Sequence, residues 1–191
     1  SYADESILSE TGSAGYVTAG AASRLVALYT VAISDGADVI LNCCSSVGQV
    51  CDSMQDFARF TGVPIVRIDE EMCREAVRSA GRIGVLATLP STLEPTRATI
   101  LRVAREMGRR VNVSDGLVEG AFGLAPEPFK EKLCQKGTEL SSCCDLLVLA
   151  QGSMAYAEAA VAAACGKPVL SSPRFGALSV RRALEAKGLL S

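Results

Sequence analysis

Histidine and tryptophan are absent from the 191 residues of this chain, and only 5% of its residues are aromatic. Without histidine, a structural zinc site would depend on cysteines at spacings such as C-x2-C. The eight cysteines instead include two adjacent pairs, Cys43/Cys44 and Cys143/Cys144. We therefore expect no metal site, and we expect most of the thiols to be reduced and to fill the core.

Long apolar runs and clusters of basic charge are also absent. No stretch of about 20 apolar residues is available to cross a membrane, and a net charge of -2 with scattered Lys and Arg offers no basic face to nucleic acid. The opening SYADESILSE carries three acidic and no basic side chains, which is unlike a signal peptide. We expect a cytoplasmic protein with no nucleic-acid or membrane partner. Neither a G-x-G-x-x-G fingerprint nor a P-loop occurs, so no organic cofactor is expected.

What the chain does have is an alternation of short β-branched runs with longer segments of helical period. Hydrophobic residues make up 49% of it, enough for one domain or two small lobes. Apolar runs of about five residues between amphipathic segments predict an α/β fold, a parallel sheet with helices on its faces. Glycines stand where C-terminal helix caps belong, at Gly62, Gly81, Gly108 and Gly166. The predicted strands are ADVILN, VPIVRID, RIGVLAT, RRVNVSD, CDLLVLA and KPVLSS.

Two of the predicted strands are followed by similar sequences. The segment DVILNCCSSVG from Asp38 aligns with DLLVLAQGSMA from Asp145, and the next strands, GVPIV and GKPVL, align as well. A repeat at this distance indicates two pseudo-symmetric lobes, which we place at residues 1–81 plus 176–191 and at residues 82–175. Ligands of parallel sheets bind beyond the carboxyl ends of the strands, so both segments should face one cleft between the lobes. The alignment pairs Cys44 with Gln151, Ser45 with Gly152 and Ser46 with Ser153.

Cys44, Ser45 and Ser46 form a candidate site at the first of these strand ends. A thiol followed by two hydroxyl residues and a helix lies beside N–H groups that can bind an anion, and this placement favours the thiolate near neutral pH. Such a thiolate can remove a proton from a carbon next to a carboxylate, while the donors stabilise the enolate that forms. For an isolated cysteine, a turn of small residues without function is the alternative. Because the segment is repeated, we favour the catalytic interpretation.

At these segments the chain resembles the aspartate/glutamate/hydantoin racemase family. CCSS resembles the ACNT element of that family, GVLATLPST its GxxxTxxT element and LVLAQGSM its LxLGCT element, over nearly the whole chain. The resemblance implies a two-lobed, cofactor-independent enzyme with a thiol on each side of the substrate carbon. It implies racemase- or epimerase-type proton transfer in an amino acid, a hydantoin or a related carboxylate, with Cys44 as the base. In such a family we expect a homodimer or a larger homo-oligomer.

Gln151 stands where the family has its second cysteine, and an amide cannot transfer a proton as a thiol does. Ser153, a water held by Gln151, and the pair Cys143 and Cys144 are alternative second carriers. A single thiol would also suffice in a decarboxylase, as in the arylmalonate decarboxylases that resemble the family, or in a cis–trans isomerase of a dicarboxylate such as maleate. A relative that binds its ligand without catalysis is a further alternative.

Polar residues at the strand ends are candidates for binding the substrate carboxylate. Those after the strand RIGVLA have a second interpretation, because Ser91 or Thr92 could cap the helix that comes after them. The candidates are Ser45, Ser46, Thr88, Ser91, Thr92 and Gly152.

Ordinary structural roles are favoured for several other residues. Asp69 is expected to cap the helix after it, Arg174 to lie at the surface, and Cys43 to pack away from the cleft. The opening DESIL is interpreted as the second strand of the first lobe, which implies that an N-terminal strand is missing or that this lobe is smaller.

Overall fold

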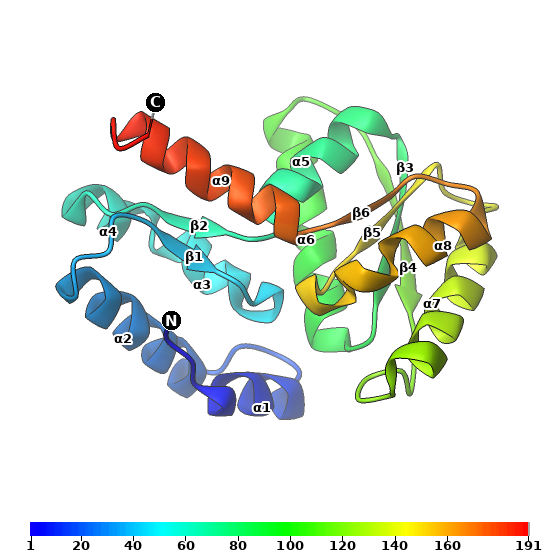
Figure 1. The fold of residues 1–191 in the computed structure, drawn as a ribbon, viewed down its shortest axis with the longest axis horizontal. Coiled ribbons are helices and arrows are strands. Elements are labelled where there is room, and N and C mark those ends of the chain that lie inside the picture. The colour runs from blue at the N-terminus through cyan, green and yellow to red at the C-terminus, as the bar shows by residue number, and fades with distance from the viewer. Residues whose placement is uncertain (191) are drawn as a thin grey trace.

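Two parallel sheets form the framework of the computed structural model, which describes residues 1–190 (Figure 1). One sheet has the order β1-β2 and the other the order β4-β3-β5-β6. Every strand pair in these sheets is parallel, which confirms the predicted α/β class. The strands are β1 (Ile40–Asn42), β2 (Ile65–Arg67), β3 (Arg82–Ala87), β4 (Asn112–Leu117), β5 (Leu146–Leu149) and β6 (Val169–Ser171).

Helices cover both faces of the four-stranded sheet, and its central strands β3 and β5 are correspondingly free of polar side chains except for the exposed Arg82 at the start of β3. All of β5 is buried, as expected for a parallel strand covered on both sides. Alternate residues of β3 and β5 contribute to two separate cores. Helices α5 (Glu70–Ser79) and α6 (Pro90–Glu106) pack in one core, and α7 (Pro126–Leu140) and α8 (Glu158–Cys165) pack in the other.

The two-stranded sheet has its own core. Helices α1 (Glu5–Ala14) and α2 (Ala19–Ser34) lie on one side of it, and α9 (Pro173–Ala186) lies on the other (Figure 1). The third core includes Ile7, Leu25, Tyr29 and Ile65. The division of the chain at residue 81 stays a prediction, and α5, which precedes that residue, packs with the second sheet.

The long helix predicted after β1 is interrupted. The chain passes through a 3-10 turn, η1 (Ser45–Val47), into α3 (Gly48–Ser53), and then bends at Met54 into α4 (Gln55–Thr61). Met54 is both the C-cap of α3 and the N-cap of α4, so the two helices do not join into one. The turn η1 precedes them and lies close to the carboxyl end of β1.

Two expectations about local structure are wrong. DESIL begins helix α1 and is not a strand, because the Asp4 carboxylate accepts a 2.9 Å hydrogen bond from the Ser6 backbone N–H and satisfies a free donor of the first turn. Gly81 does not cap α5, since the helix ends at the extended residue Ala80 and leads straight into β3. The other three predicted glycine caps do have left-handed backbone, with φ of 69°, 63° and 65° at Gly62, Gly108 and Gly166.

Candidate active site

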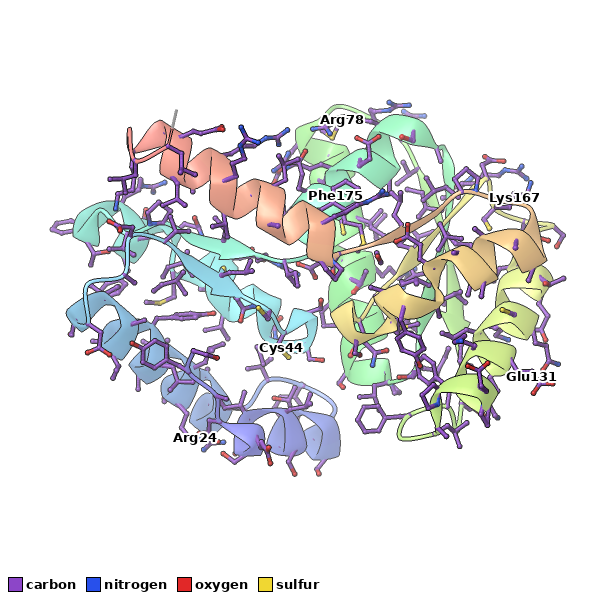
Figure 2. All side chains as sticks on the ribbon, viewed as in Figure 1. Arg24, Cys44, Arg78, Glu131, Lys167 and Phe175 are labelled. Carbon is purple, nitrogen blue, oxygen red and sulfur yellow. The ribbon has the colours of Figure 1, made fainter. Side chains whose placement is uncertain are left out.

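A cavity of about 400 Å³ lies where the carboxyl ends of the strands from the two sheets meet. Segments 43–46 after β1 and 151–153 after β5 both line it, so the two repeated segments converge on one cleft as predicted. Cys44 is labelled in Figure 2, at the end of the first sheet that faces the second. The other lining residues are Leu8, Ile68, Leu89, Thr92, Phe122 and Pro173.

The repeated segments have the same backbone course. Cys44 has φ of -105° and ψ of 109°, and Gln151 has φ of -112° and ψ of 131°. Each is followed by a 3-10 turn, η1 in the first case and η2 (Gly152–Ala157) in the second, and then by an α-helix. The sequence repeat is therefore also a structural repeat, in which position 151 corresponds to position 44.

Cys44 is half-buried at the cavity, and Asn42 fixes the backbone beside it. The Asn42 amide donates a 3.0 Å hydrogen bond to the Cys44 carbonyl. Cys43 was expected to pack in the core, but its side chain is exposed and it lines the same cavity. Strand alternation does not apply to Cys43 because β1 ends at Asn42. Although the residue is exposed, the surrounding protein partly desolvates its thiol, and this effect, followed by the neighbouring Cys44, raises the pKa of Cys43.

Other cysteines behave as core residues. Burial, reinforced by the Asp52 charge, raises the pKa of Cys51 to about 12, and burial raises the pKa of Cys73 well above its usual range. Cys143 and Cys144 precede β5 and do not line the cavity, because they lie at the opposite end of that strand. They are therefore excluded as the second proton carrier.

Hydroxyl groups surround the cavity. Ser46 Oγ and Thr92 Oγ1 are 2.9 Å apart and join η1 to α6 across the two lobes. Ser45 Oγ is buried and has no hydrogen-bond partner within the described part of the chain. Ser91 Oγ is also buried and unpartnered there, but Ser91 does not line the cavity, although contact with the substrate carboxylate is predicted for it. Neither Ser91 nor Thr92 caps α6, whose N-cap residue is Leu89, so the capping interpretation is wrong.

Gln151 is held by the end of β3. Its Oε1 accepts hydrogen bonds from the Thr88 backbone N–H, at 2.8 Å, and from Thr88 Oγ1, at 3.0 Å. Thr88 itself does not line the cavity. Its position therefore indicates that it orients Gln151, whereas direct contact with a substrate carboxylate was expected.

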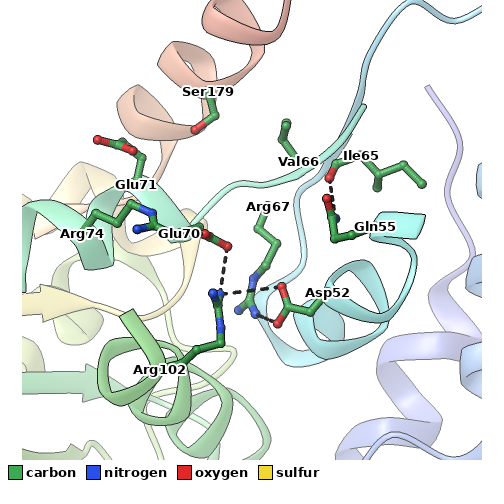
Figure 3. A pocket seen from close by; sticks show the side chains of 10 residues that line it. All are labelled: Asp52, Gln55, Ile65, Val66, Arg67, Glu70, Glu71, Arg74, Arg102 and Ser179. Atoms are coloured by element: carbon green, nitrogen blue, oxygen red, sulfur yellow. Dashed lines mark hydrogen bonds and ion pairs between the residues drawn. The ribbon is translucent and has the colours of Figure 1, made fainter. Parts of the chain in front are cut away.

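A largely buried ion-pair cluster of Arg67, Asp69 and Asp52 packs against Gly48, the residue after η1. Figure 3 shows its Arg67–Asp52 pair. Arg67, at the end of β2, donates two 2.9 Å bonds to Asp69 and one 2.7 Å bond to Asp52. Burial opposes the charge of Arg67, but Asp69 and Asp52 outweigh it and raise the pKa of the guanidinium. Asp69 occupies the N-cap position of α5, yet its carboxylate makes no capping bond, so the expected capping role is wrong. The guanidinium fits closely against Gly48, the residue after η1.

Sequence reasoning missed several residues of the site. Ser172, after β6, does not line the cavity itself but lies behind Gly152, which does. It is fully buried with an unpartnered hydroxyl, and that oxygen lies 3.5 Å from where a Cβ on Gly152 would be. The sequence does contain a signal for Ser172, because SSP at residues 171–173 places two hydroxyl residues between a strand and a helix. Ile68 and Phe122 are apolar and carry no such signal. Arg174 is a surface residue, as expected, stacked 4.7 Å over the Phe175 ring.

Two kinds of feature are absent from the described residues. Residues 1–190 contain no cluster of three or more His, Cys, Asp or Glu side chains arranged to hold a metal ion. None of the helices in that range has the length and apolar character needed to cross a membrane.

Solved structures with a similar fold include racemases and a decarboxylase. The chain matches a glutamate racemase from Bacillus anthracis at 15% identity and a TM-score of 0.71, over 88% of this chain and 66% of the other. It matches allantoin racemase from Klebsiella pneumoniae at 19% identity and a TM-score of 0.62, over 89% of this chain and 68% of the other. It matches arylmalonate decarboxylase at 18% identity and a TM-score of 0.60, over 87% of this chain and 76% of the other. The chain thus spans slightly less than two thirds of the Bacillus protein, and the fold is shared.

No curated protein matches the chain. The profile described as Asp/Glu/Hydantoin racemase matches residues 9–180, which is most of its length. On this match, the chain belongs to the Asp/Glu/hydantoin racemase family.

Proposed function

We propose that the protein catalyses cofactor-independent proton transfer at a carbon next to a carboxyl or carbonyl group, with Cys44 as the base. The substrate class is an amino acid, a hydantoin or a related small acid, and the reaction is of the racemase or epimerase type. The observation that carries the proposal is the position of Cys44, in a cavity between the two lobes with hydroxyl groups beside it. Membership of the racemase family supports it.

The chemistry requires a base and donors for the charge that develops. The Cys44 thiolate takes the proton, and the electron pair of the broken C–H bond passes into the carbonyl group to form an enolate. Ser45 has a buried hydroxyl without a partner, and the hydroxyls of Ser46 and Thr92 are next to it in the cavity wall. Ser45 is suited to donate to the enolate oxygen, and so is whichever hydroxyl of the Ser46–Thr92 pair accepts the bond between them, since its own hydrogen stays free. Donors placed in advance lower the barrier.

The fate of the enolate depends on the group that faces the opposite side of the carbon. A racemase needs a second group there that returns a proton, whereas a decarboxylase needs one acid only, because loss of CO2 generates the enolate. Gln151 stands at the position that corresponds to Cys44. It is the reason to keep a single-thiol decarboxylase or dicarboxylate isomerase as the second candidate.

The test is exchange of the α-proton with D2O, followed by proton NMR. Enantiopure α-amino acids, enantiopure 5-substituted hydantoins and α-substituted malonates form the panel, with the rate in protein-free solution subtracted. Cys44→Ala should abolish exchange, with a loss of about 100-fold or more expected for removal of a general base. Cys143→Ala is the matched control, because that thiol is exposed and lies away from the cavity.

Exchange at the native rate in Cys44→Ala would contradict the assignment of the base. A compound that raises the melting temperature but shows no exchange or decarboxylation with the native protein would support the binding-only alternative. Dialysis against a chelator should leave the rate unchanged, since the proposed reaction needs no metal.

A further inference from the structure

The orientation of the Gln151 side chain is fixed by hydrogen-bond chemistry. A backbone N–H can only donate, so the amide atom that lies 2.8 Å from Thr88 N must be the carbonyl oxygen. Thr88 Oγ1 lies 3.0 Å from the same atom and adds a second donor. An amide flip would place two donors against each other, and therefore the observed orientation is the only one compatible with these contacts.

This orientation leaves the Gln151 amide nitrogen free for a ligand. Among the hydrogen bonds of residues 1–190, none uses Nε2, and the residue lines the cavity opposite the Cys44 segment. An amide N–H donates but does not accept a proton, and both bonds to Oε1 come from Thr88. Gln151 is thus suited neither to act as a base nor to hold a basic water through its oxygen.

Ser153 is not activated as a proton carrier. A serine hydroxyl needs an adjacent base to take part in proton transfer. The Ser153 side chain is exposed, and within the described residues it makes no hydrogen bond to a base. The remaining thiol of the cavity, Cys43, belongs to the same strand end as Cys44 and approaches from the same lobe.

We propose that Gln151 is a hydrogen-bond donor to the substrate oxygen and that Cys44 is the sole proton-transfer group, so the proton leaves and returns on one face of the carbon. This inference rests on the part of the proposed function that makes Cys44 the base; because one-face transfer retains configuration, it favours the single-thiol candidate over the racemase. In exchange, Cys44 takes the proton as the enolate forms, the thiol exchanges it with solvent, and the same thiol returns a deuteron. In decarboxylation, the C–C bond breaks with its electron pair left on the enolate, CO2 departs, and the Cys44 thiol protonates the carbon.

A mechanism with one thiol and a mechanism with a proton carrier on each face differ in stereochemistry. With one thiol, an enantiopure compound gains deuterium at its α-carbon while its configuration is retained. A missing acid on the other face slows inversion by about 100-fold relative to exchange. An α-aryl-α-methylmalonate should give a single enantiomer of the monoacid.

The test measures deuterium incorporation by NMR and enantiomeric composition by chiral chromatography on the same samples of that panel. We expect exchange with retention in the native protein. In Gln151→Cys, which also lacks the N–H donor, we expect slower exchange, with inversion at a rate close to that reduced rate of exchange. Gln151→Met keeps the side-chain length but removes the N–H donor, and we expect exchange to fall about 100-fold, as for loss of an oxyanion donor. Gln135→Met, on the exposed surface of α7, is the control and should exchange at the native rate.

A second variant separates the donor role from the role in the fold. Gln151→Glu keeps an oxygen that accepts both bonds from Thr88 but replaces the N–H group by an anionic oxygen. It should fold as the native protein does and also lose exchange. Its pH profile should differ from that of Gln151→Met, because protonation of the introduced carboxylate restores an O–H donor at low pH.

The outcomes distinguish the inference from the proposed function. If the native protein inverts the substrate once for each exchange, the one-face mechanism is overturned while Cys44 remains the base. Native exchange rates in both Gln151→Met and Gln151→Glu would overturn the donor role. If no compound in the panel shows exchange or decarboxylation that depends on Cys44, the proposed function fails, and the inference fails with it.

Discussion

Gly48 is the position at which a single methyl group should disturb both the fold and the site. Its backbone, with φ of -57° and ψ of -30°, is ordinary for alanine, so Gly48→Ala introduces no backbone strain. The new Cβ, however, would lie 2.7 Å from Arg67 Nε and closer still to the rest of the guanidinium. Arg67 has no free direction in which to move, because its side chain is 3% exposed and is bonded to Asp69 and Asp52.

The protein has two ways to accommodate the methyl group. If Arg67 leaves its place, Asp69, which is fully buried, loses its partner, at a cost of about 3–5 kcal/mol. If α3 shifts outward instead, overpacking costs about 1–3 kcal/mol. The higher helix propensity of alanine offsets at most about 1 kcal/mol. Since the cheaper response prevails, we expect a net destabilisation of about 1–3 kcal/mol and a displaced η1.

The destabilisation is measured by urea unfolding followed by far-UV circular dichroism, because the chain has no tryptophan for fluorescence. The displacement of η1 is measured by the rate of α-proton exchange, which should fall because η1 begins directly after Cys44. Gly12→Ala is the matched control. Gly12 lies inside α1 with nothing within 4 Å of an added Cβ, and the change should stabilise the protein by about 0.5–1 kcal/mol. Equal stability of Gly48→Ala and the native protein would refute the reasoning.

Three further results are expected. Thr88→Val removes the hydroxyl donor to Gln151 but keeps the N–H bond, so proton exchange should fall by about fivefold to tenfold, corresponding to one hydrogen bond of about 1 kcal/mol; an unchanged rate would argue against positioning by Thr88. Burial raises the pKa of Glu70, but its bonds to Arg102 and then Arg74 outweigh burial and lower it. Stability from the Glu70 carboxylate is therefore present above its ordinary pKa of about 4.3 and lost as the pH falls through the lowered value. Urea unfolding of Glu70→Gln should show a deficit of about 1–2 kcal/mol at pH 7 that shrinks as the pH is lowered below the ordinary pKa of Glu, and a deficit independent of pH would contradict the ion pairs. With its pKa raised to about 12, the Cys51 thiol should resist alkylation by iodoacetamide at pH 8 in the native protein. Peptide mass spectrometry measures the alkylated fraction of Cys51, and equal alkylation in the native and the unfolded protein would contradict the raised pKa.

The fold was predictable because local and long-range signals agree. The apolar runs LLVL of β5 and RIGVLA of β3 have strand length and no alternation, as buried parallel strands require. DESIL begins a helix and is not a strand, and its two apolar residues show no period that would distinguish the two. The signal for a helix is Asp4, the first residue of this stretch, whose capping bond to the Ser6 N–H becomes evident only when Ser6 is known to be helical.

The candidate site was predictable where it is repeated and not where it is unique. Cys44 and Gln151 were brought together by the alignment of two segments, and the cavity contains both. Phe122 comes from a segment without a counterpart, so no pattern connects it to the site. Ser172 follows GKPVL, which aligns with GVPIV, but the position aligned with Ser172 is the apolar Ile68, so the repeat indicates no hydroxyl there. Arg67 was missed for a physical reason, because a lone arginine at a strand end gives no indication that two carboxylates will surround it.

The repeat also explains why one side chain should decide the stereochemistry. Positions 44 and 151 have nearly the same backbone angles and each precedes a 3-10 turn, so a cysteine at position 151 would leave its strand as Cys44 does. Thr88 is buried and would then lose its acceptor, at a cost of about 1–3 kcal/mol for each of its two unmet donors. The middle of that range stays below the stability of a typical domain, about 5–15 kcal/mol. Gln151→Cys should therefore fold and place a thiol on each side of the cavity, and a folded variant that still exchanges without inversion would mean that matching backbone geometry is insufficient for two-sided proton transfer.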